Sequence, residues 1–262
     1  MITSNNRSPE AAPFLGDSID FKDGWTLHRS RQLASTNSAA ARLPAWHAVR
    51  ADVQTSGRGR TGRDWISDKG GLWLSAVLPC PGTVARWSIL PLAAGWAIIG
   101  ALNELGATSL RLRWPNDLMV GQRKLAGLLV ERYTPDTAVV GVGLNVSNSP
   151  EDVDGNLASR SARLADLLPS RCELTDVAQV VLRSIRRAHT LVINGKFPII
   201  ARELNAHWAA RRLVAITLHG HAHPFTGLFT GIDDTGRLQL TTDYASARFY
   251  EASQVALLRE LE

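Results

Sequence analysis

The pattern of apolar and polar positions divides the chain into two parts. As far as about residue 210, short apolar runs typical of buried strands alternate with longer segments of helical periodicity. We predict strands at 25–33, 47–54, 72–78, 110–114, 124–132 and 137–146, and helices starting near 35 and at 84–105, 175–193 and 198–210. Beyond Leu213, short alternating segments separated by turn residues predict strands at 213–219, 223–231, 236–242, 246–250 and 253–258.

This order of elements predicts a mixed α/β domain followed by a small all-β domain, with the fold class α/β plus a C-terminal β-barrel. Residues 1–23 are polar and contain Pro9 and Pro13, so we expect a disordered N-terminal tail. The expected domain boundaries are 24–210 for the α/β part and 211–262 for the barrel.

Composition narrows the class of protein. Of the 262 residues, 45% are hydrophobic and 20% are charged, which is ordinary for a soluble globular protein. Two cysteines make neither a disulfide framework nor a zinc site, so a reducing cytoplasm is expected. The most apolar stretch, 89–102, is interrupted by Pro91 and is too short to cross a bilayer, so no membrane partner is expected. The net charge of +5 fits an anionic ligand or partner, and equally fits ordinary solubility.

The segment Gly57–Trp65 concentrates positive charge between two predicted strands. Arg58, Arg60 and Arg63 alternate with glycines, and guanidinium groups this close repel one another unless an anion shares the site. Glycine lets the backbone approach a ligand and offer its N–H groups. We therefore predict a loop that closes over a phosphate or carboxylate. The alternatives are a solvated basic loop or a nucleic-acid-binding tail, and the flanking strands disfavour the tail.

Residues 113–127 read as a β-hairpin around a two-residue Gly121-Gln122 turn. The predicted register pairs Val120 with Arg123, Met119 with Lys124 and Asp117 with Ala126. Lys124 and Asp117 then lie on one face within reach of each other. This arrangement suits a phosphate-binding lysine, and it equally suits an ordinary surface ion pair.

The strand 139–146 has one bare face, formed by Gly141, Gly143 and Asn145. Glycine inside a strand often marks a close approach, so this face is a candidate floor for a flat ligand; a bulge or crowded strand crossing is the alternative. His219, His221 and His223 have the spacing of a metal site, but no acidic or cysteine partner is near, which favours a hairpin tip with accidental histidines.

In this order and spacing, the motifs resemble those of biotin–protein ligases over residues 25 to 262. The motifs are Ser35-Thr36-Asn37, Gln54, Gly57–Trp65, Arg113–Leu118, Lys124–Glu131 and Gly141–Asn145. The resemblance implies the catalytic fold shared with class II aminoacyl-tRNA synthetases and lipoate ligases. It implies that Mg²⁺ and ATP activate biotin to biotinyl-5′-AMP. Biotin would then pass to a lysine of the biotin carboxyl carrier protein of acetyl-CoA carboxylase.

The resemblance also implies roles for individual residues. The implied biotin contacts are Ser35, Thr36, Asn37, Gln54, Arg58, Gly59, Arg60, Lys124 and Gly127. The implied ATP and adenylate contacts are Arg58, Arg63, Trp65, Asn116, Lys124 and Asn145. Lys124, Arg60 and Asp117 are the candidate catalytic residues, with Asp117 serving either a metal ion or the acceptor lysine.

The chain departs from the family pattern at several points. Ala34 replaces an acidic residue, Arg113 replaces a lysine, and no tryptophan near 150–160 can stack on adenine, so this contact falls to Leu157 or is missing. Only 24 residues precede Trp25, so we expect the short form without a DNA-binding domain, and no specific DNA binding. A homodimer stays open.

Three other functions are alternatives to biotin ligation. A lipoate ligase or octanoyltransferase is disfavoured by the Arg-Gly-Arg loop together with Trp-Pro-Asn-Asp. A biotin-binding module without activity is disfavoured by Lys124 and Arg60. A nucleic-acid-binding regulator is disfavoured by the short N-terminus.

Overall fold

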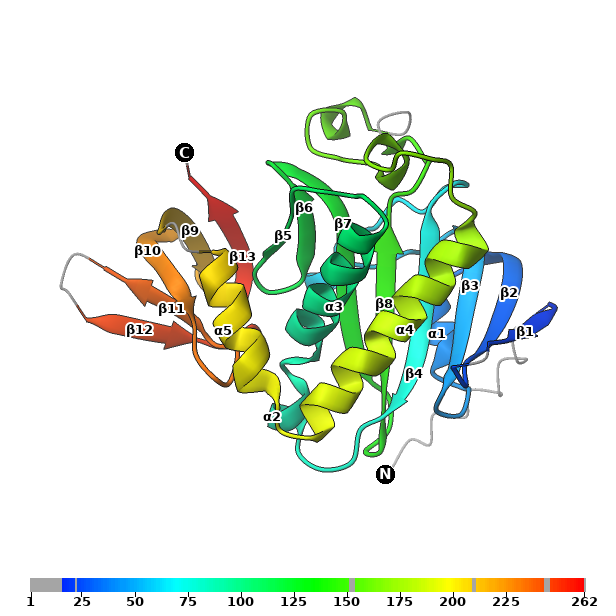
Figure 1. The fold of residues 1–262 in the computed structure, drawn as a ribbon. Coiled ribbons are helices and arrows are strands. Elements are labelled where there is room, and N and C mark those ends of the chain that lie inside the picture. The colour runs from blue at the N-terminus through cyan, green and yellow to red at the C-terminus, as the bar shows by residue number, and fades with distance from the viewer. Residues whose placement is uncertain (1–15, 22, 151–153, 209–210, 243–245, 262) are drawn as a thin grey trace, which may run out of the picture.

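The computed structural model describes residues 16–21, 23–150, 154–208, 211–242 and 246–261, and within them the chain forms two β-sheets (Figure 1). The larger sheet has eight strands in the order β1-β2-β3-β4-β8-β7-β6-β5. Its strands are β1 (Ser18–Asp20), β2 (Thr26–Leu33), β3 (His47–Gln54), β4 (Leu72–Pro79), β5 (Leu110–Arg113), β6 (Asp117–Val120), β7 (Arg123–Arg132) and β8 (Thr137–Leu144). All neighbours are antiparallel except β2 and β3, which are parallel.

Helices cover both faces of this sheet. These helices are α1 (Thr36–Ala40), α3 (Leu90–Glu104) and α4 (Leu174–Ile193). The short α2 (Val84–Trp87) precedes α3, and α5 (Phe197–His207) packs against α3 and the C-terminal sheet. Figure 1 shows α3 and α4 in front of the sheet, where they bury the main hydrophobic core. On the opposite face, Ala39 and Ala40 of α1 pack against Val49, Val77 and Val139. The alternation of side chains along each strand thus serves two cores.

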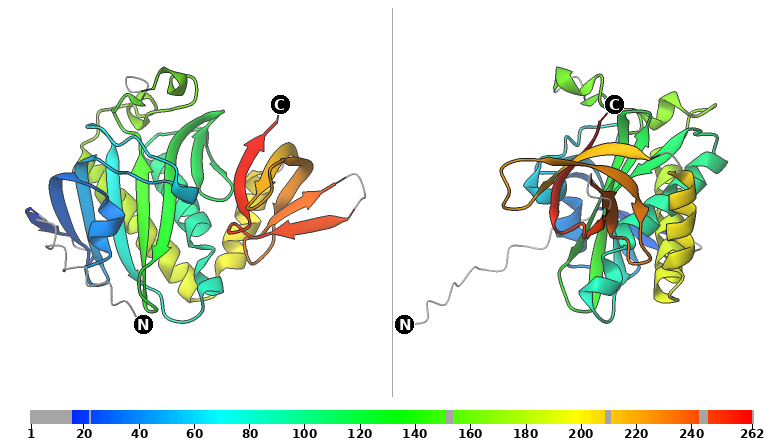
Figure 2. Two further views of the ribbon diagram at one scale, coloured as in Figure 1. Left: turned by 180° about the vertical axis from the view of Figure 1, so that it is seen from behind. Right: turned by 90° about the vertical axis from the view of Figure 1, so that its left-hand side faces the viewer.

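The second sheet is formed by the C-terminal residues and lies beside the β5–β7 side of the large sheet, as Figure 1 and the left view of Figure 2 show. Its antiparallel strands are β9 (Arg212–Leu218), β10 (Phe225–Ile232), β11 (Leu238–Thr241), β12 (Ala247–Tyr250) and β13 (Val255–Glu260), in the order β12-β11-β10-β9-β13. The predicted mixed α/β fold with a C-terminal all-β part is confirmed.

Two predicted elements differ from the structure. The helix expected at 84–105 is divided into α2 and α3, and Pro91, which lacks an N–H donor, lies in the first turn of α3. The disordered tail is wrong at residues 18–20, because β1 pairs with β2 through Ile19 and Leu27. Residues 1–15 of that tail, and the expected helix end at 209–210, lie outside the described residues, and the domain boundaries stay predictions.

The hairpin register is right at its turn and wrong at its base. Met119 pairs with Lys124 as predicted, but Asp117 pairs with Gly127 instead of Ala126. The register shifts between Leu118 and Met119, where β7 contains one extra residue, a β-bulge that the alternating pattern does not reveal.

Candidate active site

A cavity of about 850 Å³ lies between the large sheet and β13. This volume is in the range of small-molecule sites. Every residue that the sequence predicts for the site lines this cavity, including Ser35 at one end, Lys124 at the other and Asn145 on β8. Leu157, the residue considered for the adenine contact, also lines it. The structure therefore brings the predicted residues together, whereas their individual roles stay predictions.

One end of the cavity is formed by uncharged polar side chains that bond to one another. We call Thr36, Asn37 and Gln54, which line the cavity, together with Ser75, which is fully buried and bonded to them, the neutral cluster. The first N–H of α1, that of Thr36, donates to Gln54 Oε1 at 2.8 Å, and Thr36 Oγ1 lies 3.0 Å from the same atom. Ser75 Oγ lies 2.7 Å from Thr36 Oγ1 and 2.6 Å from Asn37 Oδ1. These atoms are held by short bonds at a helix start and on two strands, so they form a fixed surface.

Two further residues, Glu131 and Ser67, accept hydrogen bonds from the neutral cluster. Asn37 Nδ2 donates to Glu131 Oε2 at 2.7 Å, and Gln54 Nε2 donates to Ser67 Oγ at 2.9 Å. Sequence reasoning gave no role to Ser67, Ser75 or Glu131. Ser75 does carry a signal, since it is the one hydroxyl in the buried run of β4.

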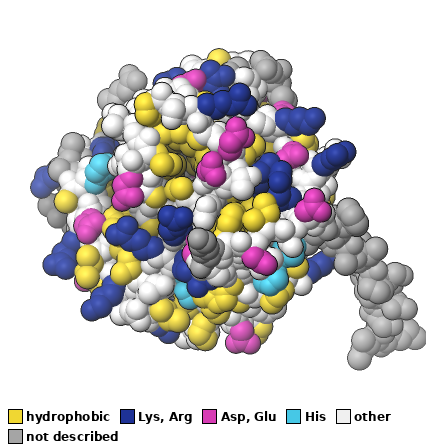
Figure 3. Space-filling model, turned by 45° about the vertical axis from the view of Figure 1, so that its right-hand side comes forward, with side chains coloured by type: hydrophobic (Ala, Val, Ile, Leu, Met, Phe, Trp, Pro, Cys, Tyr) yellow, Lys and Arg dark blue, Asp and Glu magenta, His cyan; other side chains and the backbone are white. Residues whose placement is uncertain are grey.

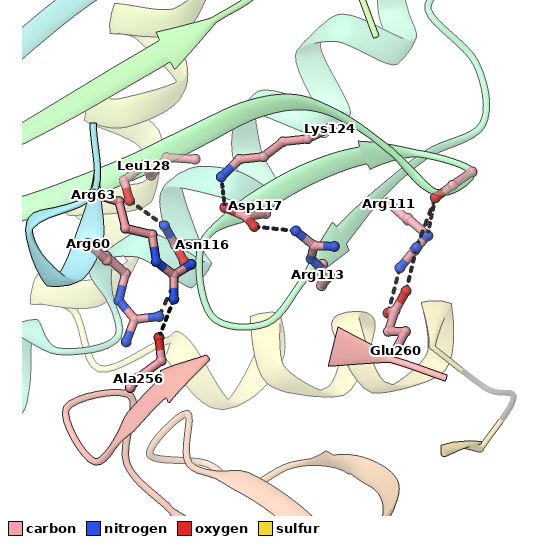
Figure 4. A network of polar contacts seen from close by, with 11 residues as sticks. Arg60, Arg63, Arg111, Arg113, Asn116, Asp117, Lys124, Leu128, Ala256 and Glu260 are labelled. Carbon is pink, nitrogen blue, oxygen red and sulfur yellow. Dashed lines mark hydrogen bonds and ion pairs between the residues drawn. The ribbon is translucent and has the colours of Figure 1, made fainter. Parts of the chain in front are cut away.

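The other end of the cavity is charged. Asp117 lies between two cations, with Lys124 Nζ 2.7 Å from Oδ1 and Arg113 Nη2 2.7 Å from Oδ2 (Figure 4). Burial alone would raise the pKa of Asp117, but the charges of Lys124 and Arg113 outweigh it and hold that pKa below its ordinary value. The contact predicted between Lys124 and Asp117 is therefore present, despite the register shift.

The metal role of Asp117 stays a prediction. Both of its carboxylate oxygens are taken by cations, and the described part of the chain has no group of three or more His, Cys, Asp and Glu placed to hold a metal ion. His219, His221 and His223 belong to no such group within the described residues, and all three are exposed between β9 and β10.

The arginine loop reaches across the cavity to the C-terminal sheet. Arg60 Nη2 donates to the carbonyl oxygens of Ala252 at 2.6 Å and Val255 at 3.0 Å, and Arg63 Nη2 donates to that of Ala256 at 2.9 Å. Figure 4 shows Arg60 and Arg63 side by side above β13. Burial lowers the pKa of Arg60, although nearby Asp117 opposes the change. Neutral carbonyl groups therefore hold these two guanidinium groups in place.

The bare face of β8, predicted as a floor for a flat ligand, is closely approached in the structure by the protein's own side chains. A Cβ atom at Gly143 would lie 2.6 Å from the Trp65 ring, and one at Gly141 would lie 2.3 Å from Asn37 Oδ1. Trp65 also contacts Lys124, whose Nζ lies 4.8 Å from the ring centroid, a cation–π distance. The glycines thus let Trp65 and Asn37 lie against the strand.

A partly buried ion cluster joins the C-terminal sheet to the hairpin. Glu260 at the end of β13 accepts two bonds from Arg111 on β5, at 2.7 and 2.6 Å, and one from Arg212 at 3.1 Å. Burial would raise the pKa of Glu260, but the two arginines hold it below its ordinary value. Arg111 also donates to the Gly121 carbonyl in the hairpin turn. These contacts keep β13 beside the cavity.

Two buried asparagines complete the wall. Asn116 Nδ2 donates to the Leu128 carbonyl at 2.7 Å, and its Oδ1 lies 3.5 Å from Arg60. Asn145 Oδ1 accepts from Asn148 at 3.0 Å. Both amides are therefore oriented by the protein, as groups that meet a ligand in a fixed geometry need to be.

The sequence of residues 30–145 matches the Biotin/lipoate A/B protein ligase family. Over 241 residues the chain is 35% identical to the biotin–[acetyl-CoA-carboxylase] ligase of Mycobacterium tuberculosis, covering 83% of this chain and 84% of that protein. The chain belongs to the biotin–protein ligase family. It is a ligase enzyme.

Further relatives agree with this assignment. The ligase is 29% identical over 234 residues to the bifunctional ligase/repressor BirA of Bacillus subtilis, covering 87% of this chain and 70% of that protein. Its fold matches that of the Aquifex aeolicus biotin protein ligase in complex with biotin and ATP, with a TM-score of 0.77, 25% identity, and coverage of 90% of this chain and 99% of that chain.

The surface and the helices give two further facts about the ligase. On the face shown in Figure 3, positive and negative side chains are interspersed with apolar ones, so the net charge of +5 is not gathered there in one patch. None of the helices in the described ranges combines the length and apolarity needed to cross a bilayer.

Proposed function

We propose that the ligase joins biotin to ATP as biotinyl-5′-AMP and then transfers biotin to a lysine of a carboxyl carrier protein. The observation that carries this proposal is the division of one cavity into the neutral cluster and a charged end. The complex of the Aquifex relative with biotin and ATP supports it. The neutral cluster offers oxygen and amide groups to the uncharged ureido ring of biotin, and the cations suit the phosphates of ATP.

In the first step the biotin carboxylate attacks the α-phosphorus of ATP and pyrophosphate leaves. Negative charge grows on the phosphoryl oxygens, and Lys124 and Arg60 stabilise it from fixed positions. Asp117 forms an ion pair with the Lys124 ammonium group, and the Trp65 ring packs beside the same group. Asp117 thus serves to orient Lys124.

We assign Mg²⁺ to the substrate as Mg-ATP. The cation would be bound mainly by phosphate oxygens and water, as is usual for this ion, because Asp117 is already paired with two cations. The protein's own share of the charge stabilisation then comes from Lys124 and the arginine loop.

In the second step an acceptor lysine attacks the acyl carbon of the mixed anhydride and AMP leaves. Asp117 is the carboxylate closest to Lys124 and Arg113, so it stays charged and is poorly suited to take a proton from the incoming amine. The name of the Mycobacterium relative supports the carrier domain of acetyl-CoA carboxylase as the acceptor.

The direct test is incubation of the ligase with labelled biotin, ATP and a carrier fragment. We expect label on one carrier lysine only when both small molecules are present. Equal transfer of lipoate would favour a lipoate ligase, and biotin binding without transfer would favour a binding module. Either result would end the proposal.

Three expectations stay predictions of the sequence. Absence of operator binding is tested by a gel shift at rising salt, since nonspecific binding weakens as salt increases. The homodimer is tested by light scattering with and without biotin and ATP. The cytoplasmic location is tested by cell fractionation.

A further inference from the structure

The neutral cluster has fewer hydroxyl hydrogens than close oxygen–oxygen contacts. Three of its oxygen pairs lie within bonding distance, namely Ser75 with Thr36, Ser75 with Asn37 Oδ1, and Thr36 with Gln54 Oε1. Only two hydroxyl hydrogens, those of Ser75 and Thr36, can serve these three pairs. One oxygen–oxygen contact therefore lacks a hydrogen, in a place where Thr36, Asn37 and Ser75 are all at most 5% exposed.

The missing hydrogen could come from Asn37 if its amide were turned over. The NH₂ group would then face Ser75 and complete the set. In the structure this group faces Glu131 instead, with Nδ2 2.7 Å from Oε2. An ionised carboxylate only accepts hydrogen bonds, so Glu131 requires the NH₂ group of Asn37 on its own side. The negative charge of Glu131 therefore determines which side of the Asn37 amide carries the nitrogen and which carries the oxygen.

Glu131 is well placed to hold this orientation. It lies on β7 and does not line the cavity, whereas Leu129, two residues before it on the same face of the strand, does. Tyr133 donates to the same Oε2 atom at 2.9 Å. Burial and Glu131 raise the pKa of Tyr133 to about 12, so its hydroxyl stays a donor.

We propose that Glu131 is a positioning and specificity-determining residue. It turns the Asn37 amide so that the neutral cluster presents excess oxygen acceptors to the cavity, which selects a ligand with N–H donors such as a cyclic urea. This inference rests on the proposed function, because it concerns the ureido end of the same ligand. Glu131 acts through Asn37 and does not touch the ligand.

The first test measures biotin binding by calorimetry without ATP. Glu131→Met removes the acceptor, frees the amide to donate to Ser75, and should weaken biotin binding about tenfold or more. Glu131→Gln keeps an oxygen that can face Asn37 and should restore most of the affinity. Tyr133→Phe, which removes an exposed hydroxyl that donates to Glu131, should stay within about twofold of the original protein. Equal affinity of Glu131→Met and the original protein would overturn the proposal.

A ligand ratio separates positioning from general loosening. Biotin methylated on one ureido nitrogen lacks one N–H donor, so the original protein should bind it much less tightly than biotin. In Glu131→Met that preference should shrink at least about fivefold, since the acceptors are then already satisfied. If both ligands weaken by the same factor, Glu131 has only a structural role.

A reciprocal exchange keeps the test valid if Glu131→Met does not fold. Asn37→Asp alone places two carboxylates together and should lose most biotin affinity. Asn37→Asp with Glu131→Gln again has one donor facing one acceptor, and it leaves an oxygen toward Ser75, so affinity should recover at least about tenfold over the single variant. No recovery would refute the coupling. Failure of the original protein to bind biotin would instead refute the proposed function.

Discussion

The two ends of the cavity hold their polar groups in different ways. At the neutral cluster, the residues bond to each other at distances from 2.6 to 3.0 Å, and all belong to the large sheet or to α1. At the charged end, cations from a loop and a hairpin are held by one carboxylate and by carbonyl groups of the C-terminal sheet. The geometry of the first end is set by hydrogen bonds among its own side chains, and that of the second is set by contacts between the two sheets.

This difference predicts two kinds of variant. Changes at the neutral cluster should mainly weaken biotin binding, because that surface recognises an uncharged group by geometry. Changes at the charged end should mainly slow the chemical step, because its charges act on negative charge that develops in the transition state. A variant at the neutral cluster that mainly slows the chemical step, or one at the charged end that mainly weakens biotin binding, would contradict this comparison.

The largest expected effect is on Lys124. Lys124→Ala should lower biotin-dependent ATP–pyrophosphate exchange by about 10²–10³-fold, since it removes a preorganised cation from the transition state. Biotin affinity should fall much less. Arg123→Ala, at the exposed neighbouring position on the same hairpin, is the matched control and should keep near-normal exchange. Near-normal exchange in Lys124→Ala would contradict its role.

The next effect concerns Gly141 beside the neutral cluster. Gly141→Ala places a Cβ atom 2.3 Å from Asn37 Oδ1 and should weaken biotin binding. Overpacking of this kind corresponds to a loss of about 10- to 100-fold. Gly227→Ala is the control, because its Cβ would meet only ordinary contacts from 3.5 Å. The biotin affinity is measured by calorimetry. An unchanged affinity in Gly141→Ala would mean that Asn37 moves away freely, and it would contradict the prediction.

A smaller effect is expected where Arg60 meets the C-terminal sheet. Arg60→Gly removes the bonds to Ala252 and Val255, so the loop should close less well over the adenylate. Released biotinyl-AMP should then label lysines of a bystander protein several times faster. Arg248→Ala, exposed on β12, is the control. Unchanged retention of the adenylate would count against the closing loop.

The smallest effect concerns Glu260. Its folded pKa is lowered, so its contribution to stability is present above the unfolded value of about 4.3 and is lost as the pH falls through the folded value. Glu260→Gln should therefore reduce stability at pH 7 and flatten the loss below about pH 4. The same variant should raise KM for ATP and leave KM for biotin unchanged. Denaturation curves with the same pH dependence in both proteins would contradict this account.

The sequence predicts most of the fold because periodicity and turn residues are local signals. It predicts the hairpin turn and the contact between Lys124 and Asp117, although not the bulge that shifts their register. β1 is too short to show a period, and it becomes a strand only because β2 offers an edge.

The site is less fully predictable, because its missing parts are long-range contacts. Arg60 meets Ala252, 192 residues away, and Arg111 meets Glu260, 149 residues away, so no local pattern links them. Ser75 on β4 and Glu131 on β7 are far from Asn37 in the sequence, so their bonds to it become visible only in the folded structure. The motifs identify the residues that line the cavity but not those that hold them.

Biotin-dependent ATP–pyrophosphate exchange tests the central claim most directly, because it requires both ends of the cavity in one event. The account predicts exchange that starts when biotin is added, is absent with lipoate, and is lost in Lys124→Ala. Exchange that does not depend on biotin, or none at saturating biotin and Mg-ATP, would contradict it.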